Sequence, residues 1–318
     1  MLSRIAESLF WIGRYIERAD DTARILDIYL QQILEDASVE RAACQSLFEV
    51  MGRELDGAEE DDDGPAATIG VQHVLDQLVY DQSSPSSITG ALFAARINAR
   101  SARDSVSSEL WEALNLTYLE LDEQRRRAER MGPHRFFQWV RERTALAAGV
   151  ADSTMSRDES WRFLVLGRSI ERADMTARLI TTLSAPGASG PSWTTLLRSC
   201  GAYEAYLRTY RGRVTDLTAA EFLLLDRLFP RSMFFSLSLA EDCLNWLGSG
   251  AGRVGTVDAA HRLLGRARTA MEYRGVDEMV SDLANHLEGI QSACADATLA
   301  LGTRYFPHAA IAWTGKGA

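Results

Sequence analysis

The chain has 318 residues, of which 46% are hydrophobic and 25% charged, a composition typical of a globular protein with a large core. Its formal net charge of -10 argues against nucleic acid and against an anionic membrane as partners, because both attract basic surfaces. No apolar run approaches the roughly 18–20 residues that cross a bilayer, and the run near the N-terminus is too short for a signal peptide. We therefore expect a cytoplasmic protein.

The first predicted element is a long helix over residues 5–30, where apolar residues recur at three- and four-residue spacing. These apolar residues are Ile5, Leu9, Ile12, Ile16, Ala19, Ala23, Leu26 and Leu30. The stretch "GRYIERADDTARI" (13–25) lies within this helix and forms a second stripe beside the apolar one. That stripe consists of Gly13, Glu17, Asp20 and Arg24, with Arg14, Arg18 and Asp21 on its outer side.

Helix-forming residues dominate the rest of the chain, and no alternating β-branched run is flanked by hairpin turns. Stretches rich in Gly, Pro, Ser or Asp indicate the loops between helices. They lie at residues 57–68, 81–87, 131–134, 185–192 and 248–256. We predict an all-α fold, a multi-helix bundle of roughly ten to twelve helices.

The segment "ARINARSARDSVSSELWEALN" (95–115) predicts two helices joined by a turn at residues 104–105. The first helix carries a row of arginines, and the second carries acidic, aromatic and amide side chains. The arginines are Arg96, Arg100 and Arg103, and the facing residues are Glu109, Trp111, Glu112 and Asn115. Two interpretations stay open: the rows brace the helical hairpin, or they form the wall of an anion-binding pocket.

The opening motif returns as "GRSIERADMTARL" (167–179), with ten identities in thirteen positions. The matching stripe is Gly167, Glu171, Asp174 and Arg178. In addition, "VLDQLVYD" (74–81) corresponds to "LLDRLFPR" (224–231), and "PSSI" (85–88) resembles "PRSM" (230–233). We interpret these matches as an internal duplication. It predicts one domain, residues 1–318, whose halves at about 1–150 and 151–318 pack about a pseudo-twofold axis.

The repeated charges indicate specified partners, because a solvated face does not need the same charges at the same positions. One interpretation is an ion-pair network that locks the two halves in register. A second is a site where four carboxylates hold a hard cation or a cationic ligand group, while arginines take a phosphate or carboxylate. A third is a partner-docking surface. The carboxylates are Glu17, Asp20, Glu171 and Asp174, and the arginines are Arg14, Arg18, Arg168 and Arg172.

Motifs for several enzyme classes and metal sites are missing from the sequence. No glutamate precedes a histidine by three residues, as a ferritin-like diiron site requires, and Asp258-x-x-His261 is interpreted as a helix start. The motifs HExxH and GxSxG are also missing, which excludes the zinc-peptidase and serine-hydrolase interpretations. GxGxxG occurs once, as "GAGRVG" (250–255), but it lies in a predicted loop with no predicted strand before it, so a Rossmann interpretation fails as well. We expect no cofactor and assign no metal ligands. The four cysteines form no CxxC pair and are predicted to be reduced and mostly buried: Cys44, Cys200, Cys243 and Cys294.

Four segments together resemble the alpha-E domain proteins, which are bacterial all-helical proteins named for a recurring Glu-Arg motif. They are "LSRIAESLFWIGRYIERADDTAR" (2–24), "NARSARDSVSSELWEALN" (98–115), "GRSIERADMTAR" (167–178) and "FPRSMFFSL" (229–237). The resemblance covers the chain to about residue 305. It implies that the protein accompanies circularly permuted ATP-grasp proteins and transglutaminase-like proteins, in systems that make, modify or process peptides.

We therefore expect a helical accessory or substrate-positioning protein that works with such an ATP-grasp ligase and a transglutaminase-like protein. A peptide or an amino acid is the expected ligand. Two alternatives stay open: an enzyme of acyl or aminoacyl transfer that uses the doubled motif for acid–base chemistry, and a carboxylate metal-binding protein. A water-filled pocket lined by both motif copies would favour catalysis, and a sealed ion-pair core would exclude it.

Overall fold

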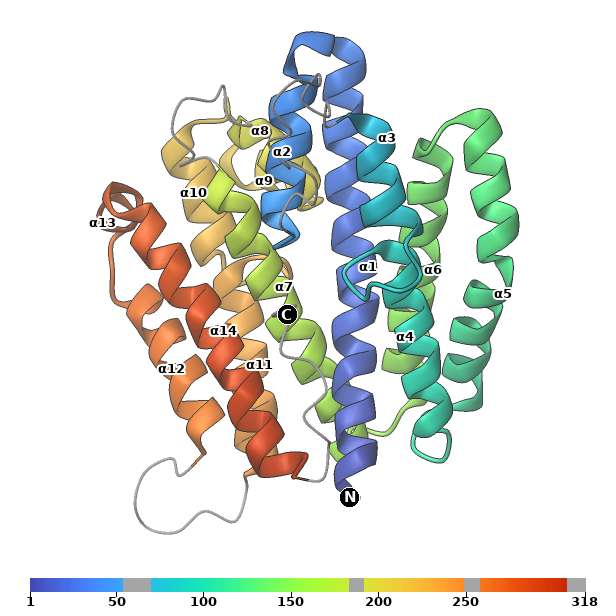
Figure 1. Ribbon diagram of the computed structural model, residues 1–318. Coiled ribbons are helices and arrows are strands. Elements are labelled where there is room, and N and C mark those ends of the chain that lie inside the picture. The colour runs from blue at the N-terminus through green and yellow to red at the C-terminus, as the bar shows by residue number, and fades with distance from the viewer. Residues whose placement is uncertain (54–69, 183–191, 249–257, 308–318) are drawn as a thin grey trace, which may run out of the picture.

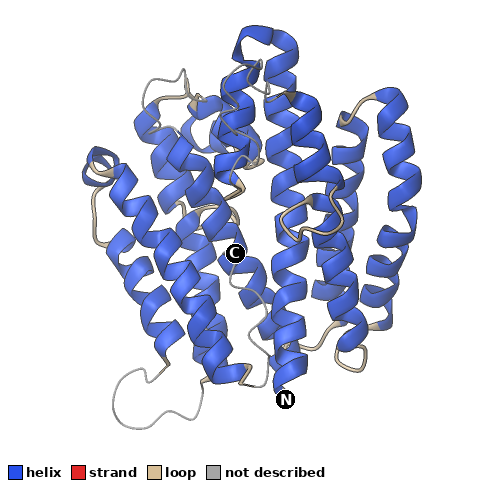
Figure 2. Ribbon diagram, in the orientation of Figure 1, coloured by secondary structure: helices blue, strands red, loops and turns tan. Residues whose placement is uncertain are grey.

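A computed structural model describes residues 1–53, 70–182, 192–248 and 258–307 of the protein. Every regular element in these ranges is helical, which confirms the predicted all-α bundle (Figure 2). The predicted loop at 57–68 lies outside the described residues, as do those at 185–192 and 248–256 except for their end residues Ser192 and Gly248. No helix in the described ranges combines the length and apolar character that crossing a membrane requires.

The first half of the chain contains six of the fourteen α-helices that the described residues form. They are α1 (Ser3–Glu35), α2 (Glu40–Val50), α3 (Val71–Val74), α4 (Ile88–Ser101), α5 (Ser108–Met131) and α6 (His134–Thr154). A 3-10 turn (Ala37–Val39) precedes α2, and a π-helix (Leu75–Tyr80) continues α3. The predicted loops at 81–87 and 131–134 fall between these helices, as expected.

The second half contains the remaining eight. They are α7 (Glu159–Thr181), α8 (Trp193–Ser199), α9 (Tyr203–Tyr210), α10 (Asp216–Leu225), α11 (Met233–Leu247), α12 (Ala259–Glu272), α13 (Val276–Ser281) and α14 (Leu283–Tyr305). The prediction of ten to twelve helices is too low. Helices of four to eight residues, such as α3 and α13, are too short to show an amphipathic period.

The two helices that carry the motif, α1 and α7, form the centre of the bundle and share its largest interface (Figure 1). Helices α4, α5 and α6 flank α1 on one side, and α11, α12 and α14 flank α7 on the other. The short helices α2 and α8 cover one end, where α2 packs on α7 and α8 packs on α1. The charged stripes of α1 and α7 therefore lie in the middle of the protein.

The predicted first helix is confirmed as α1, which contains no proline and a single glycine. The predicted apolar stripe is buried, with Leu9, Ala19 and Leu26 fully inaccessible to solvent. The helix ends at Glu35, where the following Asp36 accepts a hydrogen bond from the backbone N–H of Ser38 and begins the 3-10 turn. Burial of one stripe along 33 residues explains the length of α1.

Helices α1 and α7 cross at the two motif glycines. A Cβ atom on Gly13 would lie 2.0 Å from the carbonyl oxygen of Leu164, and one on Gly167 would lie 2.0 Å from that of Phe10. Both neighbours are backbone atoms, so neither can move aside as a side chain would. Only glycine allows the helices to approach this closely, and the approach brings the charged residues that follow each glycine together.

The matching segments beside the crossing make matching contacts. Ser87 caps α4 and also donates to the carbonyl oxygen of Asp81, while Ser232 caps α11 and donates to that of Asp226. Asp81 therefore matches Asp226, and the alignment of 74–81 with 224–231 is wrong by five residues. A shared pattern of leucine and aspartate produced that error. The origin of the halves by duplication stays a prediction.

Candidate functional site

The doubled motif forms a buried charge cluster, which we call the Glu-Arg cluster, at the crossing of α1 and α7. Each helix contributes one glutamate, and the arginines that bind it come from the opposite helix or from the loop before α11. The exposed fractions of Glu17 and Glu171 are only 3% and 1%. Buried charges of this kind persist only when they are paired, because water no longer solvates them.

Glu17, on α1, is held mainly by Arg172 of α7. The guanidinium Nε lies 2.6 Å from one carboxylate oxygen of Glu17 and Nη2 lies 2.7 Å from the other, which is the two-pronged geometry of the strongest ion pairs. Arg231, from the loop before α11, adds a third contact at 3.0 Å. The carboxylate is thus fully engaged by two cations.

Glu171, on α7, has the mirrored arrangement. Arg18 of α1 donates from Nε at 2.5 Å and from Nη2 at 3.0 Å, again to both carboxylate oxygens. Arg14 of α1 donates to the same carboxylate through its Nε, and its Nη1 donates to the hydroxyl of Thr298 on α14 at 2.8 Å. Each half therefore supplies the carboxylate that the other half neutralises.

The motif arginines also fix the starts of the flanking helices. Nη1 of Arg18 donates to the carbonyl oxygen of Pro85 at 3.3 Å, just before α4. Nη1 of Arg172 donates to that of Pro230 at 3.0 Å, just before α11. One arginine on each central helix thereby connects the opposite glutamate with a flanking helix of its own half.

The motif aspartates and the last motif arginines form pairs within each helix. The Arg24–Asp20 distance is 2.8 Å and the Arg178–Asp174 distance is 3.1 Å. Each arginine also lies against a glycine in the left-handed region, Arg24 against Gly201 (φ 61°) and Arg178 against Gly52 (φ 62°). A Cβ atom there would lie 3.0 Å from Nη1 of Arg24 or 2.5 Å from Nη1 of Arg178. These arginines therefore connect each long helix to the end of the other half's short helix, α8 or α2.

Sequence reasoning missed two members of the Glu-Arg cluster, Asp21 and Arg231. Asp21 is 7% exposed and binds Arg231, which also binds Asp20, whereas the helical-wheel argument placed Asp21 on the outer side. The second motif copy has Met175 in place of Asp21, and "PSSI" has Ser86 in place of Arg231. The only available signal was that both residues lie in segments that resemble the alpha-E proteins.

The charges shift the pKa values of the buried carboxyl groups in opposite directions. Burial alone raises the pKa of Glu17, but Arg172 and Arg231 outweigh it and lower the pKa to about 2. Arg14 and Arg18 likewise overcome burial and lower the pKa of Glu171 to about 2. For Asp21, burial prevails over the attraction of Arg231 and raises the pKa to about 8. The two glutamates stay ionised at neutral pH.

Arg168 forms no ion pair with Glu17 or Glu171. Its nearest acidic partner is Asp152 of α6, with Nη2 3.6 Å from Oδ1, although its charge still helps to lower the pKa of Glu17. Arg14, which occupies the same position in the first copy, contacts Glu171 directly. The two halves of the Glu-Arg cluster therefore differ in which arginine joins it.

Two of the four predicted facing residues contact the arginine row, and the two glutamates do not. Arg96 donates to Asn115 at 2.8 Å and lies over the ring of Tyr118, while Arg103, just after α4, lies over the ring of Trp111. Arg100, Glu109 and Glu112 are exposed and form no ion pair within the described ranges. The hairpin is braced through aromatic rings and an amide. None of these residues hydrogen-bonds to the Glu-Arg cluster.

Three carboxylates of the Glu-Arg cluster are close enough to share a cation. Ligand oxygens of Glu17, Asp20 and Asp21 all lie within 4.8 Å of one another. The guanidinium of Arg231 contacts all three, so a metal ion would have to displace it. Glu171 and Asp174 do not belong to this group, so the four acids proposed from the sequence do not converge on one point.

The predicted start of a helix at Asp258 is confirmed, because its side chain accepts a hydrogen bond from the backbone N–H of His261 and caps α12. The four cysteines are free and buried, as expected. Burial raises the pKa of the Cys200 thiol to about 12. The buried thiols are therefore poor nucleophiles.

The fold and the Glu-Arg cluster define a class of all-helical proteins whose two central helices are joined by reciprocal Glu–Arg pairs. The chain belongs to the Alpha-E family, described as a predicted alpha-helical domain with a conserved ER motif, whose family model matches residues 1–306. Within the matched residues, the doubled motif contributes two Glu-Arg pairs, Glu17–Arg18 and Glu171–Arg172.

Similar proteins include uncharacterised proteins of Mycobacterium bovis and Mycobacterium tuberculosis, each 26% identical over 315 residues. The alignment covers 92% of this chain but 36% of the relatives, so the chain spans about a third of their length. No solved structure matches the chain.

Proposed function

We propose that this protein is a non-catalytic helical accessory protein that binds a circularly permuted ATP-grasp ligase and positions its peptide substrate, beside a transglutaminase-like partner. The observation that carries the proposal is the state of the doubled motif. Glu17 and Glu171 are buried and bound by arginines on both carboxylate oxygens. The family's signature residues therefore hold the fold together, which leaves the surface as the functional part.

Acid–base catalysis by the motif is disfavoured for two reasons. A general acid or base works best with a pKa near the operating pH and needs contact with the substrate. The pKa values of Glu17 and Glu171 are lowered to about 2, and both side chains are sealed from solvent. Glu17 and Glu171 thus lack both the proton affinity and the access that acyl transfer requires.

The relatives support a role beside other domains. In the mycobacterial proteins the matching region occupies about a third of a longer chain. A domain that is joined to further chain in its relatives is well suited to work against a partner in a complex. The identity of that partner as an ATP-grasp ligase follows from the alpha-E resemblance.

Co-purification tests the proposal. The full chain and a circularly permuted ATP-grasp protein from the same organism are co-expressed, with an affinity tag on one of them, and run on size-exclusion chromatography with and without ATP and a peptide. We expect a stoichiometric complex. Separate elution under all of these conditions would overturn the proposal.

The variant Glu17→Gln/Glu171→Gln separates this role from catalysis. We expect the double variant to lose stability and to bind the ligase only to the extent that it stays folded. A variant that keeps its fold and its complex but loses the peptide-modifying activity of the assembly would favour the transfer-enzyme alternative.

A further inference from the structure

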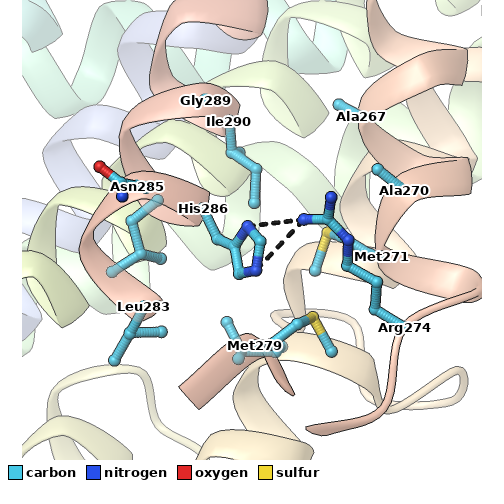
Figure 3. A pocket seen from close by; sticks show the side chains of 12 residues that line it. Ala267, Ala270, Met271, Arg274, Met279, Leu283, Asn285, His286, Gly289 and Ile290 are labelled. Carbon is cyan, nitrogen blue, oxygen red and sulfur yellow. Dashed lines mark hydrogen bonds between the residues drawn. The ribbon is translucent and has the colours of Figure 1, made fainter. Parts of the chain in front are cut away.

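A groove opens on the second half of the bundle, between α10, α12, α13 and α14 (Figure 3). Its volume is about 190 Å³. Its apolar wall consists of side chains that are at least 94% buried: Leu224, Met271, Met279, Leu287 and Ile290. An apolar lining with a few polar groups at its edge is typical of small-molecule sites.

The lining of the groove differs from the matching part of the first half, because α14 lacks two aromatic residues that α6 has. Gln291 of α14 donates to Thr181 of α7, and Arg141 of α6 pairs with Asp27 of α1. Thr181 and Asp27 occupy the same position in the two motif helices, 14 residues after Gly167 and Gly13 (181 − 167 = 27 − 13 = 14). Position 291 on α14 therefore matches position 141 on α6.

This register matches His286 and Gly289 of α14 with Phe136 and Trp139 of α6. In the first half, Phe136 is buried and packs against the ring of Trp139, with ring centroids 5.8 Å apart. In the second half a smaller polar ring and a glycine occupy these positions. A Cβ atom on Gly289 would have no neighbour within 4 Å. The groove of the second half therefore lacks the two aromatic rings that line the corresponding hollow of the first half.

The polar groups at the groove mouth are hydrogen-bond donors or cations. Arg274 follows α12 and extends toward His286 on α14, with 2.8 Å between Nη1 of Arg274 and Nδ1 of His286 (Figure 3). The acid nearest to Arg274 is Glu278 of α13, at 3.7 Å and largely exposed, which makes it a weak competitor in water. Arg274 is therefore available to bind an anion at the edge of an apolar groove.

We propose that this groove binds a small carboxylate with an apolar chain. The chain packs between Met271, Met279 and Ile290, and the carboxylate replaces His286 as the acceptor for Arg274. Flexible methionine side chains accommodate apolar ligands of different shape, and a guanidinium binds a carboxylate through two parallel hydrogen bonds. The inference is independent of the proposed partner in peptide modification.

Isothermal titration calorimetry of the full chain tests the proposal, with octanoate as the fatty-acid probe and N-acetyl-leucine as the amino-acid probe. Saturable binding of either carboxylate at one site per chain is expected, and the tighter of the two identifies the source of the natural ligand. Octanamide, which has the same chain without the charge, should bind at least tenfold more weakly than octanoate. Equal binding of octanoate and octanamide, or no saturable binding of either carboxylate, would overturn the proposal.

Two variants locate the site. Arg274→Gln changes an exposed side chain and should weaken octanoate binding about tenfold while leaving octanamide unaffected. Gly289→Trp restores the aromatic residue found at Trp139 and should abolish binding. Gly302→Trp is the matched control, because it lies on the same helix, has equally open surroundings and lies outside the groove.

Circular dichroism and thermal unfolding verify that both tryptophan variants are folded. If octanoate still binds to the folded Gly289→Trp protein, the groove is not its site. If neither carboxylate binds to the wild type and Gly289→Trp instead changes the oligomeric state in light scattering, the groove holds a second copy of the chain. Both results would contradict the proposal.

Discussion

Replacing Gly13 by alanine tests the crossing of α1 and α7 with a single methyl group. The added Cβ would lie 2.0 Å from the carbonyl oxygen of Leu164 and 2.9 Å from the backbone nitrogen of Arg168. Non-bonded carbon atoms normally stay about 3.5–4.0 Å from their neighbours. The helices must therefore separate by about 1 Å or more, and this separation lengthens the ion pairs of the Glu-Arg cluster.

The magnitude follows from two opposing contributions. Alanine in place of a helical glycine stabilises a helix by about 1 kcal/mol. Overpacking a well-packed interior costs about 1–3 kcal/mol. Stretching the buried ion pairs of Glu17 and Glu171 adds to that cost, because water cannot solvate these carboxylates in place of the arginines. We expect Gly13→Ala to lower the free energy of unfolding by about 2 kcal/mol or more, against its helix propensity.

Urea denaturation followed by circular dichroism measures this change. The matched control is Gly149→Ala on α6, where an added Cβ meets nothing within 4 Å. This control should be more stable than the wild type by about 0.5–1 kcal/mol, because it gains helix propensity without a clash. If Gly13→Ala were as stable as the wild type, the close approach of the two helices would be wrong.

Three further predictions follow from the buried titratable groups and the helix ends. Folding raises the pKa of Asp21 from its ordinary value of 3.8 to about 8, so between these pH values the folded state binds one proton more than the unfolded state and its stability falls as pH rises from about 4 to 8. Asp21→Asn, which stays neutral, should reduce this fall. An unchanged dependence of the urea midpoint on pH would contradict the assignment. Gly201→Ala should lower the free energy of unfolding by roughly 1 kcal/mol or more, because φ is 61° there and Arg24 lies 3.0 Å from the added Cβ; a thermal midpoint equal to that of the wild type would refute this. The four buried thiols should react with a thiol reagent only after unfolding, since burial raises the pKa of Cys44 to about 11 and that of Cys200 to about 12; rapid labelling of the native protein would disprove it.

The long helices and the meeting of the motif copies could be predicted from the sequence. The apolar period of α1 continues over eight positions, and a period of that length determines both the helix and its buried face. The repetition of Glu17 at Glu171 and of Arg18 at Arg172 indicated partners across the two halves. The structure contains such pairs, because each glutamate is bound by arginines of the other half.

Asp21 and Arg231 could not be predicted by the same reasoning, because repetition was its only guide. Met175 and Ser86 stand at the matching positions, so an argument from repeated residues discards both. In the structure they bind each other, and Arg231 also binds Glu17 and Asp20. A pair that occurs in one half alone leaves no periodic or repeated signal in the sequence.

The groove of the second half was also invisible in the sequence. Its lining differs from that of the first half by the missing aromatic rings at His286 and Gly289, and that comparison needs the register of α6 against α14. The two halves are spaced differently along the chain, so the register comes only from side-chain contacts. Local patterns predict helices and their faces, whereas a hollow between four helices depends on contacts between distant residues.

A double-mutant cycle across the central crossing tests the role of the doubled motif most directly. Glu17→Gln, Arg172→Met and the double variant are compared with the wild type in urea denaturation, which gives the coupling free energy between the two side chains. The structure predicts that each single variant loses about 3 kcal/mol or more, and that the coupling is at least about 1.5 kcal/mol. A coupling near zero, with single variants as stable as the wild type, would contradict a motif that joins the two halves.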